Sequence, residues 1–160
     1  DHALTDIRIA LSFCCDNELM YKASLAEMLN FNTLYEESVV ICNECLQDKE
    51  RAEFLVLKAE ALMGVGQPHY AFELATRALE LDSTLTSAYR PLIQFYMKQE
   101  KYEDALRLCR RHQELFQSDT AILLAHTISA YSLEEYEEAL QMVCRAAWVN
   151  PEEASIFYNK

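Results

Sequence analysis

The sequence has 160 residues, of which 51% are hydrophobic and 25% charged, values typical of one globular domain with a substantial core. Its 26 acidic and 14 basic residues give a net charge of −12, which excludes the basic surface that nucleic acids require, and no apolar run is long enough to span a membrane. Only two glycines and three prolines are present. Since β-hairpin turns and phosphate-binding loops depend on glycine, we predict an all-α chain.

Residues 1–16 are predicted to form a leading helix. Leu4, Ile7, Ala10, Leu11 and Cys14 share one helical face, which would pack on the elements that follow. From residue 19 onward, apolar residues recur every three to four positions in blocks of about twelve to fourteen residues, separated by polar breaks. This pattern predicts pairs of amphipathic helices.

The helix pairs repeat at a constant interval along the chain. Ala71, Ala105 and Ala139 are evenly spaced, and the last two end the similar stretches Glu-Lys-Tyr-Glu-Asp-Ala and Glu-Glu-Tyr-Glu-Glu-Ala. The same spacing separates Leu55, Tyr89 and Leu123; Leu62, Tyr96 and Ala130; Ala78, His112 and Ala146; and Asp82, Phe116 and Asn150. One unit of the repeat is therefore predicted to be a helical hairpin.

The spacing and residue types resemble the tetratricopeptide-repeat family, whose 34-residue hairpins carry small residues where the two helices cross. The resemblance implies a right-handed α-solenoid of stacked antiparallel helix pairs, forming a single domain over residues 1–160, with about four repeats over residues 19–160. We expect a weak repeat at 19–51, clear repeats at 52–85, 86–119 and 120–153, and the start of a truncated repeat at 154–160. The apolar ending of the chain would suit a solenoid that continues.

The middle repeat departs most from the family pattern. Ile93 is bulky where a small residue is expected, and His112 replaces an alanine at the helix crossing, so we expect looser or differently angled packing there. Pro91 lies early in a first helix. It falls either in the opening turn, where the missing N–H is harmless, or one turn later, where it would bend the helix.

The turn within each hairpin should carry glycine. Gly66 fits this expectation, whereas Glu100 and Glu134 replace glycine in the next two repeats. The acidic pairs 134–135 and 137–138 lie at turns and helix starts, where carboxylates complement the helix dipole. We interpret these pairs as solvated caps.

No motif indicates an enzyme, and we predict no catalytic, cofactor-binding or metal site. Glycine-rich phosphate loops, His-Glu-x-x-His and Gly-x-Ser-x-Gly are all missing. Cys42 and Cys45 form a Cys-x-x-Cys pair, but they occupy positions for small residues and are interpreted as buried thiols. His126 and His112 could approach each other across neighbouring helices, yet a satisfied core histidine is the favoured interpretation. Six cysteines without regular spacing indicate reduced thiols and an intracellular location, cytoplasmic or nuclear.

The resemblance also implies a concave groove lined by the first helices of successive repeats. Along the chain, the groove residues are acidic in the first repeats, mixed in the third repeat and apolar in the fourth. The predicted partner-binding residues are Glu27, Glu53, Val56, Glu60, Met63, Arg90, Gln94, Met97, Leu124, Ile128 and Tyr131. The lysine, asparagine and arginine clamp with which some family members grip acidic tails is not reproduced, so a basic segment followed by apolar residues is the expected ligand.

Two functions remain open at this point. The first is a non-enzymatic scaffold or adaptor that binds a protein or peptide in the groove. The alternative is a self-associating structural subunit of a large assembly, of the kind found among the tetratricopeptide subunits of the anaphase-promoting complex, with the apolar surface covered by later repeats or by a second copy of the chain.

Overall fold

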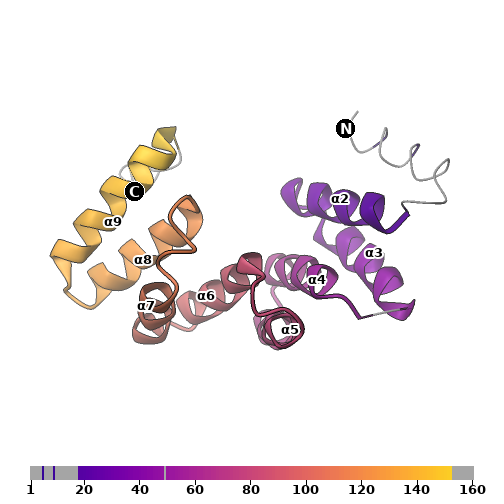
Figure 1. Cartoon of the computed structure of the whole chain (residues 1–160), viewed down its shortest axis with the longest axis horizontal. Coiled ribbons are helices and arrows are strands. Elements are labelled where there is room, and N and C mark those ends of the chain that lie inside the picture. Colours follow the sequence, from indigo (N-terminus) through magenta and orange to yellow (C-terminus); the bar gives the residue numbers. More distant parts are fainter. Residues whose placement is uncertain (1–4, 6–8, 10–17, 49, 153–160) are drawn as a thin grey trace. The chain divides into compact units, whose positions relative to one another are not determined.

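The structure is a computed structural model that describes residues 5, 9, 18–48 and 50–152. Every regular element in these ranges is a helix, so the predicted all-α class is confirmed (Figure 1). None of these helices is long and apolar enough to cross a membrane. Apart from Thr5 and Ile9, the predicted leading helix lies outside the described residues, as does the repeat start at 154–160.

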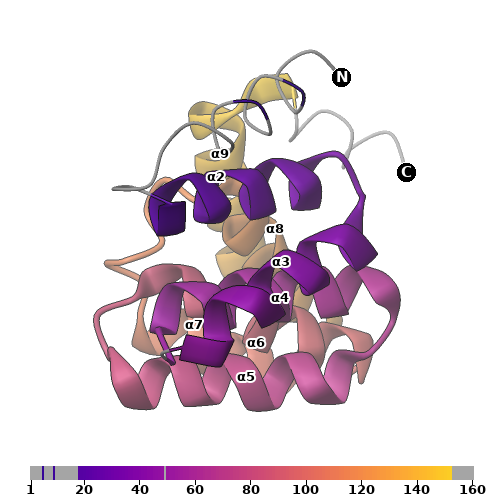
Figure 2. The same ribbon diagram turned by 90° about the vertical axis from the view of Figure 1, so that its right-hand side faces the viewer.

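The chain divides into an N-terminal unit, residues 1–91, and a C-terminal unit, residues 92–160. The N-terminal unit contains α2 (Glu18–Phe31), α3 (Tyr35–Asp48), α4 (Ala52–Val65), α5 (Pro68–Leu81) and the short 3₁₀ helix η1 (Thr86–Ala88). Figure 2 shows α2 to α5 following one another in chain order. Each helix packs against the next, and α2 also packs against α4. The N-terminal unit is therefore a stack of two helical hairpins.

Small residues allow the helices of this unit to approach closely. Ala26, Ala59, Ala71 and Ala78 have no exposed surface. Buried Cys42 and Cys45 belong to one apolar cluster together with Ala26, Phe54 and Leu57. Burial raises the pKa of the Cys42 thiol to about 12, which keeps it protonated at neutral pH. The interpretation of the Cys-x-x-Cys pair as small buried thiols is confirmed.

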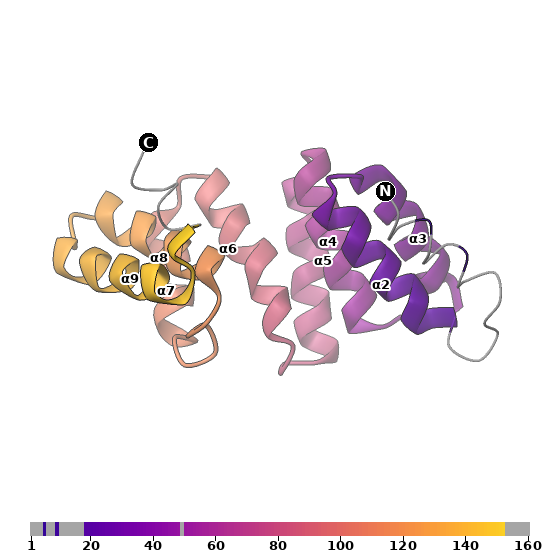
Figure 3. The same ribbon diagram turned by 90° about the horizontal axis from the view of Figure 1, so that it is seen from above.

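The C-terminal unit contains most of α6 (Tyr89–Lys98), then α7 (Tyr102–Arg111), α8 (Thr120–Ser132) and α9 (Tyr136–Val149). Helices α8 and α9 lie side by side in Figures 1 and 3, and α7 packs on α8. Pro91 is the third residue of α6, in the opening turn, where its missing N–H costs no helical hydrogen bond. Helix α7 stops at Arg111 with His112 at its C-cap, so it has ten residues where α5 and α9 have fourteen. The position where His112 replaces the usual alanine thus coincides with the early end of α7.

Each hairpin turn in the described part of the chain contains a residue in the left-handed region of backbone conformation. The φ angles are 61° at Thr33, 87° at Gly66, 55° at Glu100 and 63° at Glu134. In each turn, the N–H of the next residue donates to a carbonyl five residues earlier, as in Lys101 to Tyr96 at 2.9 Å and Glu135 to Ala130 at 2.9 Å. These are the bonds of a Schellman cap, which ends the first helix and reverses the chain. The two glutamates therefore adopt the conformation of the glycine that they replace.

Gly66→Ala is expected to lower the free energy of unfolding by about 1 kcal/mol, because an alanine strains the left-handed conformation while a glycine does not. A Cβ added at Gly66 would meet no atom within 4 Å, so steric collision plays no part. Urea denaturation measures the change. Glu134→Gly is the matched control: relief of strain and the added flexibility of the unfolded chain should nearly cancel, within about 0.5 kcal/mol. An unchanged midpoint for Gly66→Ala would contradict the left-handed turn.

Candidate functional site

The most exposed residues of helix α4 lie along one side of it. Nine of its fourteen residues are buried, because it packs between its neighbours α2, α3 and α5. Glu53 and Gly64 are exposed and Glu60 is half-buried. Their spacing of seven and four residues places them on the same side of the helix. The side chains that α4 offers along this strip are therefore two glutamates, whereas half-buried Lys58 and Val65 lie on another side of the helix.

Helix α2 adds a third glutamate at an equivalent position. Exposed Glu27 holds the place in the first hairpin that corresponds to Glu60 in the second. Asn30 fixes the two helices to each other, since its Nδ2 donates to the Leu57 carbonyl of α4 at 2.9 Å. Neighbouring packed helices lie about 8–10 Å apart. We call Glu27, Glu53 and Glu60 the acidic strip.

A pocket of about 460 Å³ opens beside Glu53, at the N-terminal end of α4. It is lined by Glu50, Arg51, Ala52, Glu53, Leu81 and Asp82. Glu50 is engaged by the Arg77 guanidinium at 3.1 Å, and Asp82 accepts hydrogen bonds from Thr84, which lower the pKa of the Asp82 carboxyl. The pocket is therefore mainly negative, and Glu53 belongs both to its wall and to the acidic strip.

Acidic side chains outnumber basic ones around the acidic strip. Residues 18–91 include twelve acidic and six basic side chains. Two of the cations bond carboxylates outside the strip: Lys22 bonds Glu18 at 2.6 Å, and Arg77 bonds Glu50 and Glu80. The strip therefore lies in a region of negative potential, which attracts cationic groups.

The structure buries two of the predicted groove residues. Val56 and Met63 are only 3% and 5% exposed, and Val56 packs with Leu55, Ala78 and Ala88 in the core. Val56 and Met63 therefore present almost no surface to a ligand in this conformation, because α4 is enclosed by three helices, and their assignment to the groove stays a prediction. Of the other predicted residues, Glu27, Glu53, Gln94 and Tyr131 are exposed, and Glu60, Arg90, Met97, Leu124 and Ile128 are half-buried.

Two residues at the twelfth place of a repeat, Asn30 and Met97, link neighbouring first helices. Asn30 holds this place in the first repeat and bonds Leu57, as described above. Met97 holds it in the third, and the Ser129 hydroxyl of α8 donates to the Met97 sulfur at 3.1 Å. Tyr131 holds it in the fourth, where it is exposed and makes an edge-to-face contact with Tyr136 at 5.6 Å. The sequence pattern placed these residues correctly on the first helices but did not reveal the bridging contacts of Asn30 and Met97.

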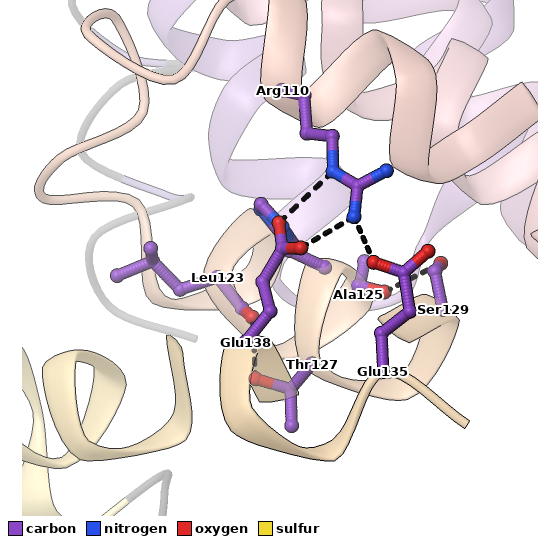
Figure 4. A network of polar contacts seen from close by, with 8 residues as sticks. Arg110, Leu123, Ala125, Thr127, Ser129, Glu135 and Glu138 are labelled. Atoms are coloured by element: carbon purple, nitrogen blue, oxygen red, sulfur yellow. Dashed lines mark hydrogen bonds and ion pairs between the residues drawn. The ribbon is translucent and has the colours of Figure 1, made fainter. Parts of the chain in front are cut away.

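A polar network joins three helices of the C-terminal unit (Figure 4). The Arg110 guanidinium of α7 lies between the carboxylates of Glu135 and Glu138, at the start of α9, and bonds both. The Nε2 atom of buried His126 on α8 lies 2.7 Å from Glu138 Oε1. These contacts, led by the hydrogen bond from Arg110, lower the pKa of Glu138 to about 2.

This network corrects one interpretation and supports another. The acidic pairs 134–135 and 137–138 were expected to be solvated caps, but Glu135 and Glu138 are ion-pair partners that hold α7 to α9. The sequence could not reveal this because the partner, Arg110, is far away along the chain. His126 is a core histidine with a hydrogen-bond partner, which is the interpretation that the sequence favoured: it is 3% exposed and is bonded to Glu138. Among the described residues, no cluster of three or more metal-ligating side chains is found.

Comparisons with known proteins identify the architecture. No protein-family model matches the sequence, and no curated protein matches it. Among solved structures, YrrB, described as a TPR protein with an unusual peptide-binding site, matches 99% of this chain and 82% of its own with a TM-score of 0.66 and 18% identity. MamA matches 96% of this chain and 90% of its own with a TM-score of 0.68 and 14% identity. The chain has the tetratricopeptide-repeat fold.

The tetratricopeptide fold explains the geometry of the acidic strip. Equivalent positions on successive first helices face the same side of the stack, so Glu27 and Glu60 lie side by side by virtue of the repeat. A second MamA structure, named MamA AMB-1, matches 85% of this chain and 75% of its own with a TM-score of 0.66 and 17% identity. At these identities the comparisons concern the fold, and the ligand must be inferred from the side chains of this chain.

Proposed function

We propose that this protein is a non-enzymatic interaction scaffold that binds a basic segment of a partner protein along the acidic strip of its N-terminal unit. The observation that carries the proposal is the solvent-reaching strip of α4, which displays Glu53 and Glu60 and is extended by Glu27 on α2. Nine of the fourteen α4 residues are buried, whereas these glutamates align on one side of the stack. We therefore assign them to ligand binding.

The spacing of the strip suits an extended basic peptide. Glu53 and Glu60 are seven residues apart, about 10.5 Å along the helix axis. A polyproline-II segment returns to the same face every three residues, after about 9.3 Å. Lysine or arginine at every third position would therefore meet successive glutamates, with one basic side chain entering the pocket beside Glu53.

The tetratricopeptide fold supports this role. The similar structure YrrB is described as having a peptide-binding site, so the fold can present one. Met97, Leu124, Ile128 and Tyr131 of the C-terminal unit remain the predicted contacts for apolar ligand residues. Gln94 of the same unit and Arg90 of the N-terminal unit remain the predicted polar contacts. An intracellular partner is consistent with the reduced, buried thiols Cys42 and Cys45.

Charge reversal tests the proposal. The triple variant Glu27→Lys, Glu53→Lys, Glu60→Lys is expected to weaken binding of a short fluorescein-labelled peptide with lysine at every third position by at least about tenfold. Fluorescence anisotropy measures the affinity. Binding by the wild-type protein should weaken as salt is added, because the attraction between exposed charges is screened.

The matched control changes the same number of charges elsewhere. Glu36, Glu73 and Glu114 are exposed and lie outside the strip, so their replacement by lysine alters the net charge equally. This control should keep most of the wild-type affinity. Equal loss in both triple variants would show that only net charge matters, and equal binding of a peptide with glutamate in place of lysine would refute a basic ligand.

A further inference from the structure

Phe31, the last residue of α2, places an aromatic ring in solvent. It is 89% exposed, and Glu27 precedes it by four residues on the same side of the helix. The corresponding residues of the next three repeats are Gly64, Lys98 and Ser132, all exposed and none of them large and apolar. The repeat fold therefore does not require an aromatic ring at this place.

Phe31 lies on the same side of the N-terminal unit as the acidic strip. Helices α2 and α4 are the first helices of two stacked hairpins, and Asn30 of α2 faces α4 because its Nδ2 bonds the Leu57 carbonyl. With about 100° of rotation per residue, Glu27 and Phe31 lie about 60° and 100° from Asn30 in one direction around α2. Glu60 lies about 60° from Leu57 in the opposite direction around α4. Opposite directions lead to the same side of two parallel helices, so the ring belongs to the strip.

A second aromatic ring borders the strip on α4. Gly64 follows Glu60 by four residues, and a Cβ added at Gly64 would collide with the ring of Tyr35. The Tyr35 ring therefore lies directly against the α4 backbone at the missing side chain. Beyond Glu60 the strip ends in an aromatic ring, as it does beyond Glu27.

Asn30, between Glu27 and Phe31, adds an unsatisfied acceptor at the same place. Its Nδ2 bonds Leu57, but its Oδ1 is buried and accepts no hydrogen bond within the part of the chain that the structure describes. A buried acceptor without a donor is unfavourable. This end of the strip therefore favours a ligand group that carries several N–H donors.

Arginine is the basic residue that suits this combination of groups. Its planar guanidinium has five N–H donors, bonds a carboxylate through two of them and stacks on aromatic faces, whereas the lysine ammonium is compact and strongly hydrated. Cation–π contacts reach about 6 Å from the ring centroid, which is also about the rise of four residues along a helix. One guanidinium can therefore bond Glu27 and stack on Phe31.

We propose that Phe31 makes the acidic strip selective for arginine, with one guanidinium of the bound segment stacked on the Phe31 ring and bonded to the Glu27 carboxylate. The excess of carboxylates in residues 18–91 favours a cation over an apolar group as the partner of this ring. The inference rests on the proposed function, which accepts lysine and arginine alike. It adds the identity of one ligand residue.

Two fluorescein-labelled peptides of equal length test the selectivity, one with lysine and one with arginine at every third position. Fluorescence anisotropy gives the Kd of each, and the wild-type protein should bind the arginine peptide more tightly. In Phe31→Leu, the ratio of the two Kd values should fall about twofold to fivefold, the range expected for one exposed cation–π contact. The affinity for the lysine peptide should change less, because leucine keeps an apolar side chain.

Two control variants separate stacking from general effects. Phe31→Tyr retains an aromatic face and should retain the wild-type ratio. Tyr70→Leu removes a ring that is 63% exposed on α5, outside the strip, and should leave both affinities unchanged. The urea midpoint of Phe31→Leu should equal that of the wild type, since an exposed side chain contributes little to folding.

Two outcomes would overturn the inference while leaving the acidic strip in place. An unchanged ratio in Phe31→Leu would mean that the ring does not contact the guanidinium. An equal loss of affinity for both peptides would mean that Phe31 acts through apolar contact alone. Failure of both peptides to bind the wild-type protein would instead refute the proposed function, and this inference with it.

Discussion

Leu106→Ala is expected to lower the free energy of unfolding of the C-terminal unit by about 3 kcal/mol, within the range for removing a buried leucine side chain. Leu106 is 1% exposed and fills the space between α7 and the α8–α9 hairpin, where it meets Ala130, Ala139 and Leu133. These neighbours are small or already fixed by other contacts, so they cannot close the cavity. Urea denaturation followed by circular dichroism measures the loss.

The repeat supplies the control for this variant. Leu140 is the same residue type at the same place of the next repeat, but it is 61% exposed. Leu140→Ala should change the free energy of unfolding by no more than about 0.5 kcal/mol. Similar losses for Leu106→Ala and Leu140→Ala would contradict the difference in burial between α7 and α9.

Glu138→Gln is expected to destabilise the same unit by about 2 kcal/mol, because the neutral amide loses the charge-assisted bonds to Arg110 and leaves buried His126 with a weaker partner. Glu138 Oε1 lies 3.1 Å from Arg110 Nε and 2.7 Å from His126 Nε2. Glu137→Gln is the control, since Glu137 is exposed on the same helix. Equal effects of the two substitutions on the free energy of unfolding would show that the network contributes no stability beyond the effect of removing one negative charge from the helix.

The same carboxylate predicts a dependence on pH. Its pKa is lowered from 4.5 to about 2 in the folded protein. A lowered folded-state pKa stabilises the native state above pH 4.5, and this contribution is lost as the pH falls toward 2. The wild-type protein should therefore lose more stability between pH 4.5 and 2 than Glu138→Gln does. Parallel stability curves for the two proteins in that range would contradict the assignment.

The parts of the fold that follow from local pattern could be predicted from the sequence. Evenly spaced alanines predict the helix crossings, and Ala71 and Ala105 are indeed fully buried, with Ala139 nearly so. Glu100 and Glu134 stand where the repeat needs a turn glycine, and both adopt positive φ angles. These features depend on a few neighbouring residues, so the pattern of one repeat carries over to the next.

Features that depend on distant neighbours could not be predicted. Val56 lies on the side of α4 that was assigned to the groove, yet it is buried because α2, α3 and α5 enclose this helix. On that side of α4, Glu53 and Glu60 reach solvent. Glu138 resembles a capping carboxylate in sequence, and only the three-dimensional arrangement brings Arg110 to it. The acidic strip was partly predicted, because Glu27, Glu53 and Glu60 were selected by position, but the narrowness of the strip is a result of packing.

The most direct measurement is a titration of the ¹⁵N-labelled protein with the lysine-containing peptide, followed by amide chemical shifts. We expect the largest changes at Glu27, Glu53 and Glu60 and at the neighbouring bridge residue Asn30, with the exposed face of α5 unchanged. Changes centred on α9 or α5, with none at these four residues, would contradict the acidic strip as the binding site.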